Sequence, residues 1–117
     1  MRQYSAAVEQ YFRRPAGELR GGCHGRAGSY REGAIVCFSA NVVDGQLREL
    51  GFRSYACPHI MAACGWLVEE LEGRPPEALQ ELDLEQLIEK FEIPVEKMGK
   101  LLILKDAARA CYESCRG

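Results

Sequence analysis

An Asp-Gly pair separates two β-rich segments of equal length, and this arrangement restricts the fold more than any other feature of the sequence. Residues 34–43 are rich in β-branched and aromatic side chains, and residues 46–55 form a second run of the same length. Asp44-Gly45 suits the two-residue type I′ turn of a β-hairpin, because both residues tolerate positive φ. With that turn, four side chains are predicted to share one buried face: Ile35, Cys37, Leu50 and Phe52.

The segments around the hairpin are predicted to be mostly helical. Before it, Val8, Tyr11 and Phe12 have helical spacing and Ser5 can cap the segment. Residues 16–33 are rich in Gly and Arg, which predicts a loop with room for one short edge strand. The 117 residues suit one domain, residues 1–117, of the α+β class, in which helices pack on one face of a small antiparallel sheet.

Apolar stripes and capping residues place the later helices. Pro58 opens a helix that ends at Gly73, and a short helical turn follows Pro75-Pro76. Asp83 caps the next helix, and Pro94 opens a longer terminal one.

Composition and charge exclude several classes of protein. The first residues lack an apolar signal segment and no apolar run is long enough to span a membrane, so a cytoplasmic protein is expected. The net charge of −2 and pI of about 5.7 argue against nucleic-acid binding. Residues 1–32 carry six arginines against three glutamates, whereas residues 66–96 carry ten acids against two bases. This asymmetry either steers a charged protein partner or reflects solvated helix faces.

The six cysteines fall into different settings. Cys37 and Cys64 lie on predicted core faces, where a free cysteine packs as a small apolar residue. Cys111 and Cys115 are one helical turn apart, a spacing that suits either a metal or the apolar stripe that they complete. The pair Cys23-His24 lies in the Gly-rich segment and is a second candidate ligand pair, or has no role.

Cys57 is the strongest candidate for chemistry. It stands between the second strand and the helix that Pro58 opens, which is the N-cap position. Free backbone N–H groups and the positive end of the helix dipole favour a thiolate there, the form that binds metal or attacks sulfur. His59 follows two residues later and is within reach of the same place; the alternative is a cysteine that merely caps the helix weakly.

Several segments occur in an order and spacing typical of one protein family. They are Tyr4-Ser5 at the first helix, the hairpin, Phe52-Arg53-Ser54-Tyr55-Ala56-Cys57, Ile60 to Cys64, Gly73-Arg74-Pro75, and Ile93 to Lys97 followed by Asp106-Ala107-Ala108. In these segments the chain resembles the scaffold proteins of iron–sulfur cluster assembly, of the IscU or NifU N-terminal type. The resemblance covers nearly the whole chain and implies that family's fold.

The resemblance also implies a site. The family holds its cluster with three cysteines and an aspartate, and Cys57 matches the second cysteine. The first cysteine position falls on Tyr30-Arg31-Glu32 or one residue later, where Glu32 stands for the acid, and the third falls on Gly99-Lys100. The family's chaperone segment Pro-Pro-Val-Lys corresponds to Pro94-Val95-Glu96-Lys97.

Three functions are compatible with these residues. The first is a scaffold that binds an iron–sulfur cluster or iron, or zinc in its place, through Cys57 together with His59, Cys23, His24, Glu32 or a second subunit of a homo-oligomer. The second is an acceptor of persulfide sulfur from a cysteine desulfurase through Cys57. The third is a paralogue without a cluster that docks on an assembly partner. No Ser–His–Asp set or carboxylate pair is recognisable, so an enzyme acting on a small molecule is not expected.

Overall fold

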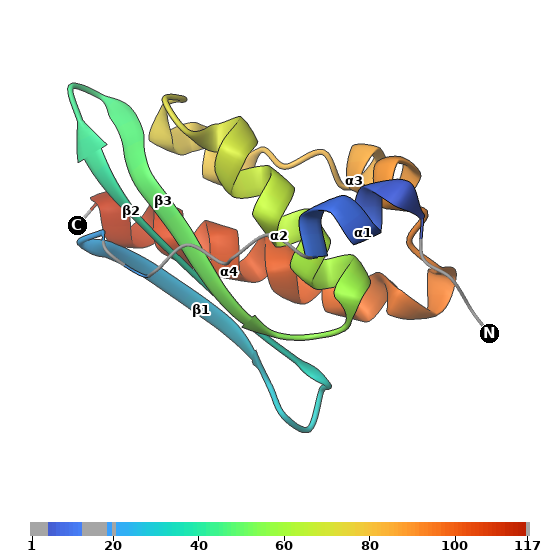
Figure 1. Ribbon diagram of the computed structural model, residues 1–117. Coiled ribbons are helices and arrows are strands. Elements are labelled where there is room, and N and C mark those ends of the chain that lie inside the picture. The colour runs from blue at the N-terminus through green and yellow to red at the C-terminus, as the bar shows by residue number, and fades with distance from the viewer. Residues whose placement is uncertain (1–4, 13–18, 20, 117) are drawn as a thin grey trace.

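The protein is a three-stranded antiparallel sheet with its helices on one face, as the sequence predicts (Figure 1). The structure is a computed structural model that describes residues 5–12, 19 and 21–116. The elements are α1 (Ala6–Phe12), β1 (Cys23–Ser29), β2 (Ala34–Val43), β3 (Gln46–Tyr55), α2 (Pro58–Leu71), the 3₁₀ turn η1 (Pro76–Gln80), α3 (Leu84–Phe91), the 3₁₀ turn η2 (Val95–Lys97) and α4 (Met98–Arg116). Helix α4 packs along β1 and β2, and α2 packs against β3 and α1.

The hairpin of β2 and β3 has the predicted turn but a different register. Asp44 and Gly45 both have positive φ, 53° and 73°, and Val43 pairs with Gln46 across them. The pairing then shifts by one residue between Ser39 and Asn41, beside Glu49, which also has a positive φ of 54°. This β-bulge adds one residue to β3, and such an insertion reverses the faces of all residues beyond it.

The bulge makes the predicted core face of the hairpin wrong. Cys37 pairs with Arg53 rather than Phe52 and is partly exposed, so it is not the core residue that the alternation predicts. Phe38 stands opposite Phe52 instead, and both are buried on the face that the helices cover. Ile35 is also buried, but it lies on the face of β2 opposite to that of Phe38. Leu50 is half-buried.

The carboxylate of Glu72 stabilises the bulge from the end of α2. It accepts hydrogen bonds from the backbone N–H groups of Glu49 and Leu50, each at 3.1 Å. Two backbone bonds of 2.8 Å add to this, because Leu47 donates to the carbonyl of Arg74 and accepts from the N–H of Gly73. The register of β3 is therefore set by contacts with α2 and not by the turn alone.

Strand β1 occupies the position where the sequence predicts a loop with a short edge strand. Its seven residues pair with β2 from Cys23 opposite Ala40 to Ser29 opposite Ala34. The strand approaches α4 closely at Gly25, where a Cβ atom would overlap the backbone N of Cys111 and the carbonyl O of Ala107. The Gly-rich composition therefore permits the strand to pack on the helix.

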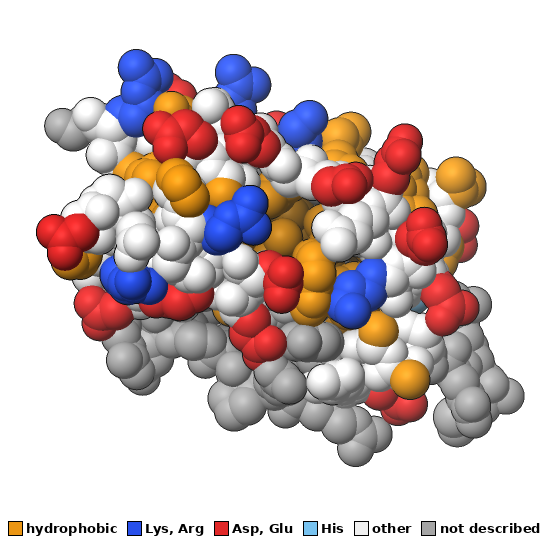
Figure 2. Space-filling view, turned by 90° about the horizontal axis from the view of Figure 1, so that it is seen from above, with side chains coloured by type: hydrophobic (Ala, Val, Ile, Leu, Met, Phe, Trp, Pro, Cys, Tyr) orange, Lys and Arg blue, Asp and Glu red, His pale blue; other side chains and the backbone are white. Residues whose placement is uncertain are grey.

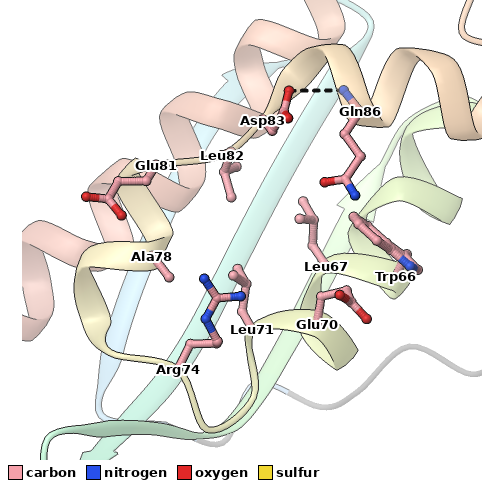
Figure 3. A pocket seen from close by; sticks show the side chains of 10 residues that line it. All are labelled: Trp66, Leu67, Glu70, Leu71, Arg74, Ala78, Glu81, Leu82, Asp83 and Gln86. Carbon is pink, nitrogen blue, oxygen red and sulfur yellow. Dashed lines mark hydrogen bonds between the residues drawn. The ribbon is translucent and has the colours of Figure 1, made fainter.

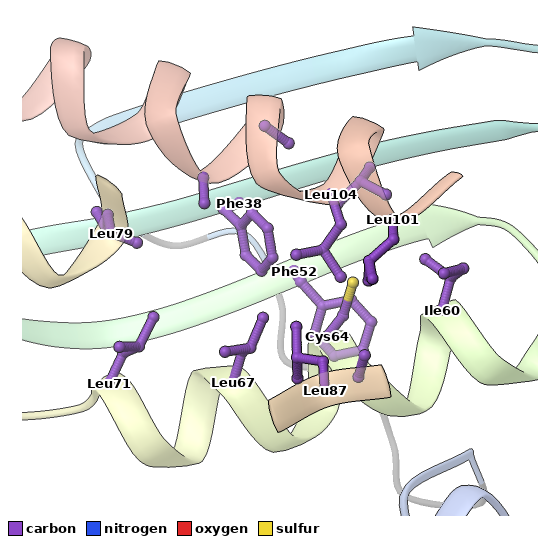
Figure 4. Packing of buried hydrophobic residues seen from close by; sticks show 14 of the residues in the cluster. Phe38, Phe52, Ile60, Cys64, Leu67, Leu71, Leu79, Leu87, Leu101 and Leu104 are labelled. Atoms are coloured by element: carbon purple, nitrogen blue, oxygen red, sulfur yellow. The ribbon is translucent and has the colours of Figure 1, made fainter. Parts of the chain in front are cut away.

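The core lies between the sheet and the helices (Figure 4). Phe38 and Phe52 from the sheet meet Leu67 of α2 and Leu104 of α4, and Cys64 is fully buried among them, as predicted. Burial of each such aromatic or leucine side chain stabilises the fold by about 1.5–3 kcal/mol.

The helix ends follow the predicted capping residues. Ser5 accepts a hydrogen bond from the N–H of Val8, and Asp83 accepts one from the N–H of Gln86. No helix in the described ranges has the length and apolar character needed to cross a lipid bilayer.

Candidate functional site

Cys57 occupies the predicted junction between strand and helix. It is the N-cap of α2, with φ −71° and ψ 162°, and Pro58 is the first residue of the helix. The Cys57 carbonyl accepts hydrogen bonds from the N–H groups of Ile60 and Met61, both at 3.1 Å. Its thiol makes no capping hydrogen bond, and the residue is partly exposed while it also packs against the hydrophobic core at the start of the helix.

Two further segments meet the end of β3 next to Cys57. The turn between β1 and β2 brings Tyr30 against Tyr55, with ring centroids 4.8 Å apart in an edge-to-face arrangement. The start of α4 reaches the same turn, because a Cβ atom at Gly33 would lie 3.3 Å from Cε of Lys100. Residues that are far apart in the sequence therefore meet at one end of the molecule.

Glu32 lies in that turn and is exposed. Its carboxylate accepts a hydrogen bond of 3.0 Å from the Ser29 hydroxyl, and the same hydroxyl oxygen accepts one of 3.2 Å from the Glu32 N–H. These bonds hold the turn, and they occupy one carboxylate oxygen of the acid that the sequence places near Cys57.

His59 is the second residue of α2, but its side chain is only 2% exposed. His59 is thus buried, whereas Cys57 is partly exposed. Cys57 and His59 are close in sequence, but the burial of His59 and the partial exposure of Cys57 give the two side chains different environments.

Cys23 and His24 do not lie in a loop, and they do not join Cys57. They are the first two residues of β1, where successive side chains point to opposite faces of the sheet. Cys23 packs against the core, and His24 is exposed. Because Cys23 pairs with Ala40 and Tyr55 pairs with Ile35, Cys23 and the end of β3 lie about 17 Å apart along β2. The expectation that this pair completes a site at Cys57 is therefore wrong.

The ligand set around Cys57 is incomplete for a cluster. Among the described residues, no three His, Cys, Asp or Glu side chains are placed so that they could hold one metal ion. All six cysteines are described, and neither the turn of residues 30–33 nor the first turn of α4 contains a second one. A [2Fe–2S] cluster takes four ligands, usually thiolates, and one chain does not supply them at this end.

A pocket between α2, η1 and α3 lies apart from the candidate ligands (Figure 3). Its apolar walls are Trp66, Leu67, Leu71, Ala78 and Leu82, and its polar residues are Glu70, Arg74, Glu81, Asp83 and Gln86. Figure 2 shows this helical face with acidic side chains spread around an apolar hollow. Much of the acidic stretch of the sequence therefore covers exposed positions of the helices and their connections.

A second, shallow pocket lies on the sheet and was not expected from the sequence. Arg26 and Arg53 flank Cys37 on neighbouring strands, and Tyr30 and Tyr55 continue the lining toward the Cys57 end. The sequence does not predict this pocket, because the Gly-rich composition of residues 16–33 indicates a loop and does not place Arg26 opposite Cys37.

Comparisons with solved structures identify the fold. An N-terminal NifU-like nitrogen-fixation protein from Brucella abortus superposes with a TM-score of 0.74 at 13% identity, over 96% of this chain and 93% of that one. The chain has the NifU N-terminal fold. An iron–sulfur cluster assembly scaffold protein for the SUF system from Fervidobacterium islandicum AW-1 gives a TM-score of 0.58 at 13% identity, over 97% and 93% of the two chains. A hypothetical protein gives 0.65 at 15% identity, over 96% of each chain.

No protein-family model and no curated protein matches the chain. Tyr30 contacts Tyr55, two residues before Cys57, and Gly33 lies close to Lys100, so the segments that the sequence resemblance aligns with the family's site meet at one end of this NifU-type fold.

Proposed function

We propose that the protein acts in iron–sulfur cluster assembly as a scaffold-like protein, with Cys57 as the residue that handles the cargo. The observation that carries this proposal is the position of a partly exposed cysteine at the strand–helix junction of a NifU-type fold. The structural relatives whose names state a role are a NifU-like protein and a SUF-system scaffold, and both match over more than nine-tenths of the chain. The protein is proposed to be a carrier rather than an enzyme.

The ligands present in one chain limit what a scaffold role can mean here. Cys57 offers one thiolate and Glu32 one carboxylate, whereas a cluster takes four ligands. A cluster or iron at Cys57 therefore requires further ligands from a second copy of the chain or from a partner protein. In this form of the proposal the cluster is cargo shared between two molecules.

Transfer of sulfur alone is the second candidate, and the single thiol favours it. The Cys57 thiolate would attack the terminal sulfur of a persulfide on a cysteine desulfurase. The sulfur–sulfur bond of the desulfurase persulfide breaks, its cysteine leaves as a thiolate, and Cys57 carries the new persulfide. This step needs one thiol and no set of metal ligands, and Cys57 offers a partly exposed thiol at the start of α2.

Anaerobic reconstitution with ferrous iron and sulfide separates the two candidates. A scaffold is expected to bind iron and sulfide in stoichiometric amounts, with a visible absorption band and association into dimers, and Cys57→Ser is expected to lose all three. Cys37→Ser is the matched control, because Cys37 is also partly exposed but lies within the sheet. A reconstituted cluster that survives Cys57→Ser would contradict the scaffold proposal.

Incubation with a cysteine desulfurase and L-cysteine tests the sulfur acceptor. Mass spectrometry of the alkylated protein is expected to find one added sulfur on the peptide that contains Cys57. Added sulfur spread over several cysteines, or retained in Cys57→Ser, would contradict this role. If neither cluster nor persulfide forms but the desulfurase still binds, the remaining function is docking on an assembly partner.

A further inference from the structure

Three thiols meet at the opposite end of the sheet from Cys57, where β1 begins and α4 ends. Cys111 and Cys115 are one turn apart on α4, and Cys23 is the first residue of β1. The Cys111 thiol donates to the Cys23 carbonyl oxygen at 3.8 Å. Cys115 follows Ser114 on α4, and the Ser114 hydroxyl accepts a hydrogen bond of 3.1 Å from the N–H of His24, so Cys115 lies beside the start of β1. Three cysteines that are up to 92 positions apart in sequence are thus neighbours where β1 meets the end of α4.

The backbone holds these side chains together independently of the thiols. The N–H of His24 donates to the Ser114 hydroxyl at 3.1 Å, which ties the start of β1 to the last turn of α4. One strand position further on, Gly25 allows the strand to touch the helix backbone. The cluster is therefore a fixed feature of the packing between β1 and α4.

The three thiols differ in access to solvent. Cys23 and Cys115 are partly exposed, whereas Cys111 is completely buried. In addition, the Cys111 thiol is directed at the backbone oxygen of Cys23 rather than at its sulfur. A reagent from solvent therefore reaches Cys23 and Cys115 before Cys111.

We propose that Cys23 and Cys115 form a reversible disulfide by exchange with a small-molecule disulfide such as oxidised glutathione. Among the described residues, no group of three or more His, Cys, Asp or Glu side chains is placed so that it could hold a metal ion. The cross-link joins the first strand to the terminal helix and leaves Cys57 free.

The exchange proceeds in two balanced steps. The Cys23 thiol loses its proton and attacks one sulfur of oxidised glutathione, whose disulfide bond breaks and releases one glutathione thiolate. The Cys115 thiol then loses its proton and attacks the Cys23 sulfur of the mixed disulfide, which releases the second glutathione. Two protein S–H bonds are lost, one S–S bond is formed, and one oxidised glutathione becomes two reduced molecules.

Burial, followed by interaction with the Cys23 thiol, raises the pKa of the Cys115 thiol above its ordinary range.

Mass spectrometry of the full chain tests the proposal. The reduced protein is incubated with oxidised glutathione, free thiols are blocked by alkylation, and the protein is digested without reduction. The expected product is lighter by two hydrogens, contains a peptide pair linked through Cys23 and Cys115, and reverts on addition of dithiothreitol. Alkylation is expected to be lost at Cys23 and Cys115 and unchanged at Cys57.

Two variants on one helix face supply the matched comparison. Cys111→Ser is expected to form the cross-link, whereas Cys115→Ser is expected to stop at the mixed disulfide on Cys23, with circular dichroism confirming that both are folded. An intramolecular disulfide that forms equally in Cys115→Ser would overturn the proposal. So would wild-type protein that yields only glutathione adducts, only disulfide-linked dimers, or a cross-link mapped to other cysteines.

Discussion

At the scale of single residues, Cys57 is the candidate reactive thiol, but its side chain contributes little to capping helix α2. Its side chain makes no hydrogen bond to the free N–H groups of α2, although it stands at the N-cap. Serine is among the preferred N-cap residues, because its hydroxyl oxygen accepts from those groups. A change at Cys57 can therefore remove the thiol without loosening the helix.

We predict that Cys57→Ser is at least as stable as the wild-type protein, with a free energy of unfolding higher by up to about 1 kcal/mol. Urea denaturation followed by circular dichroism measures this. The result also serves as the folding control for the sulfur and iron experiments. A clearly less stable variant would show that the thiol contributes packing energy that serine cannot replace.

Glu72 is the residue that couples the end of α2 to the bulge of β3. Its carboxylate accepts from the N–H groups of both Glu49 and Leu50. We predict that Glu72→Ala lowers the free energy of unfolding by about 1–2 kcal/mol, because two backbone donors lose a charged acceptor at a partly solvated site.

Glu70→Ala is the matched control for Glu72→Ala, since Glu70 is an exposed acid near the same helix end. We expect it to change stability by no more than about 0.5 kcal/mol. In NMR spectra, the amide signals of Glu49 and Leu50 should shift in Glu72→Ala alone. Equal losses of stability in both variants would indicate a general charge effect rather than support of the bulge.

At the scale of elements, β1 depends on its contact with α4 more than on its own sequence. The strand Cys23–Ser29 has little of the alternating apolar pattern that marks a strand, and Gly25 lies directly against the helix backbone. Its stability therefore comes from pairing with β2 and from the close approach that glycine allows.

We predict that Gly25→Ala lowers the free energy of unfolding by about 3 kcal/mol or more, or prevents folding, because the new methyl group meets helix backbone that cannot move aside. Gly99→Ala on α4 is the control, as nothing lies within 4 Å of a Cβ atom there. Alanine at that helical position is expected to be neutral or stabilising by up to about 1 kcal/mol. The close approach would be refuted by a Gly25→Ala protein that unfolds at the wild-type urea concentration.

Some elements can be predicted from local sequence, whereas others depend on contacts with residues that are distant in the chain. The turn at Asp44-Gly45, the helix that Pro58 opens and the cap at Asp83 are set by local chemistry, and all three are correctly predicted. Strand β1 is not predicted as a full strand, because Gly25 has meaning only in the presence of α4. The register of β3 is missed since the bulge at Glu49 is held by Glu72, which is distant in sequence.

At the scale of the whole molecule, Cys57 lies at one end of the sheet, and Cys23, Cys111 and Cys115 lie at the other. The position of Cys57 could be predicted, because a strand end and an adjacent proline determine it locally. The proximity of Lys100 to the turn at Gly33 could be predicted only from the family resemblance. The meeting of Cys23 with Cys111 and Cys115 requires the packing of the first strand on the last helix, which no local pattern contains.

The buried thiols also make the stability of the whole molecule depend on pH. Burial raises the pKa of Cys64 above its ordinary range, and burial, followed by the charge of Cys23, raises the pKa of Cys111 to about 11. In the unfolded chain these thiols lose their protons near pH 8.5. Above that pH the unfolded state binds fewer protons than the folded state, so the free energy of unfolding falls as pH rises.

We predict that stability is insensitive to these thiols below about pH 8.5 and declines from there toward pH 11. Each fully buried thiol contributes a slope of up to about 1.4 kcal/mol per pH unit in that window. Urea denaturation under reducing conditions, repeated from pH 7 to pH 11, measures the slope.

Cys64→Ala isolates one contribution, because Cys64 is fully buried in the core while lysines and tyrosines titrate alike in both proteins. The variant should be less stable at neutral pH, because it leaves a small cavity, yet lose stability less steeply above pH 9, so that the two curves converge. Parallel curves would mean that the Cys64 thiol keeps the same proton affinity in both states, which would contradict its burial among Phe38, Phe52 and Leu104.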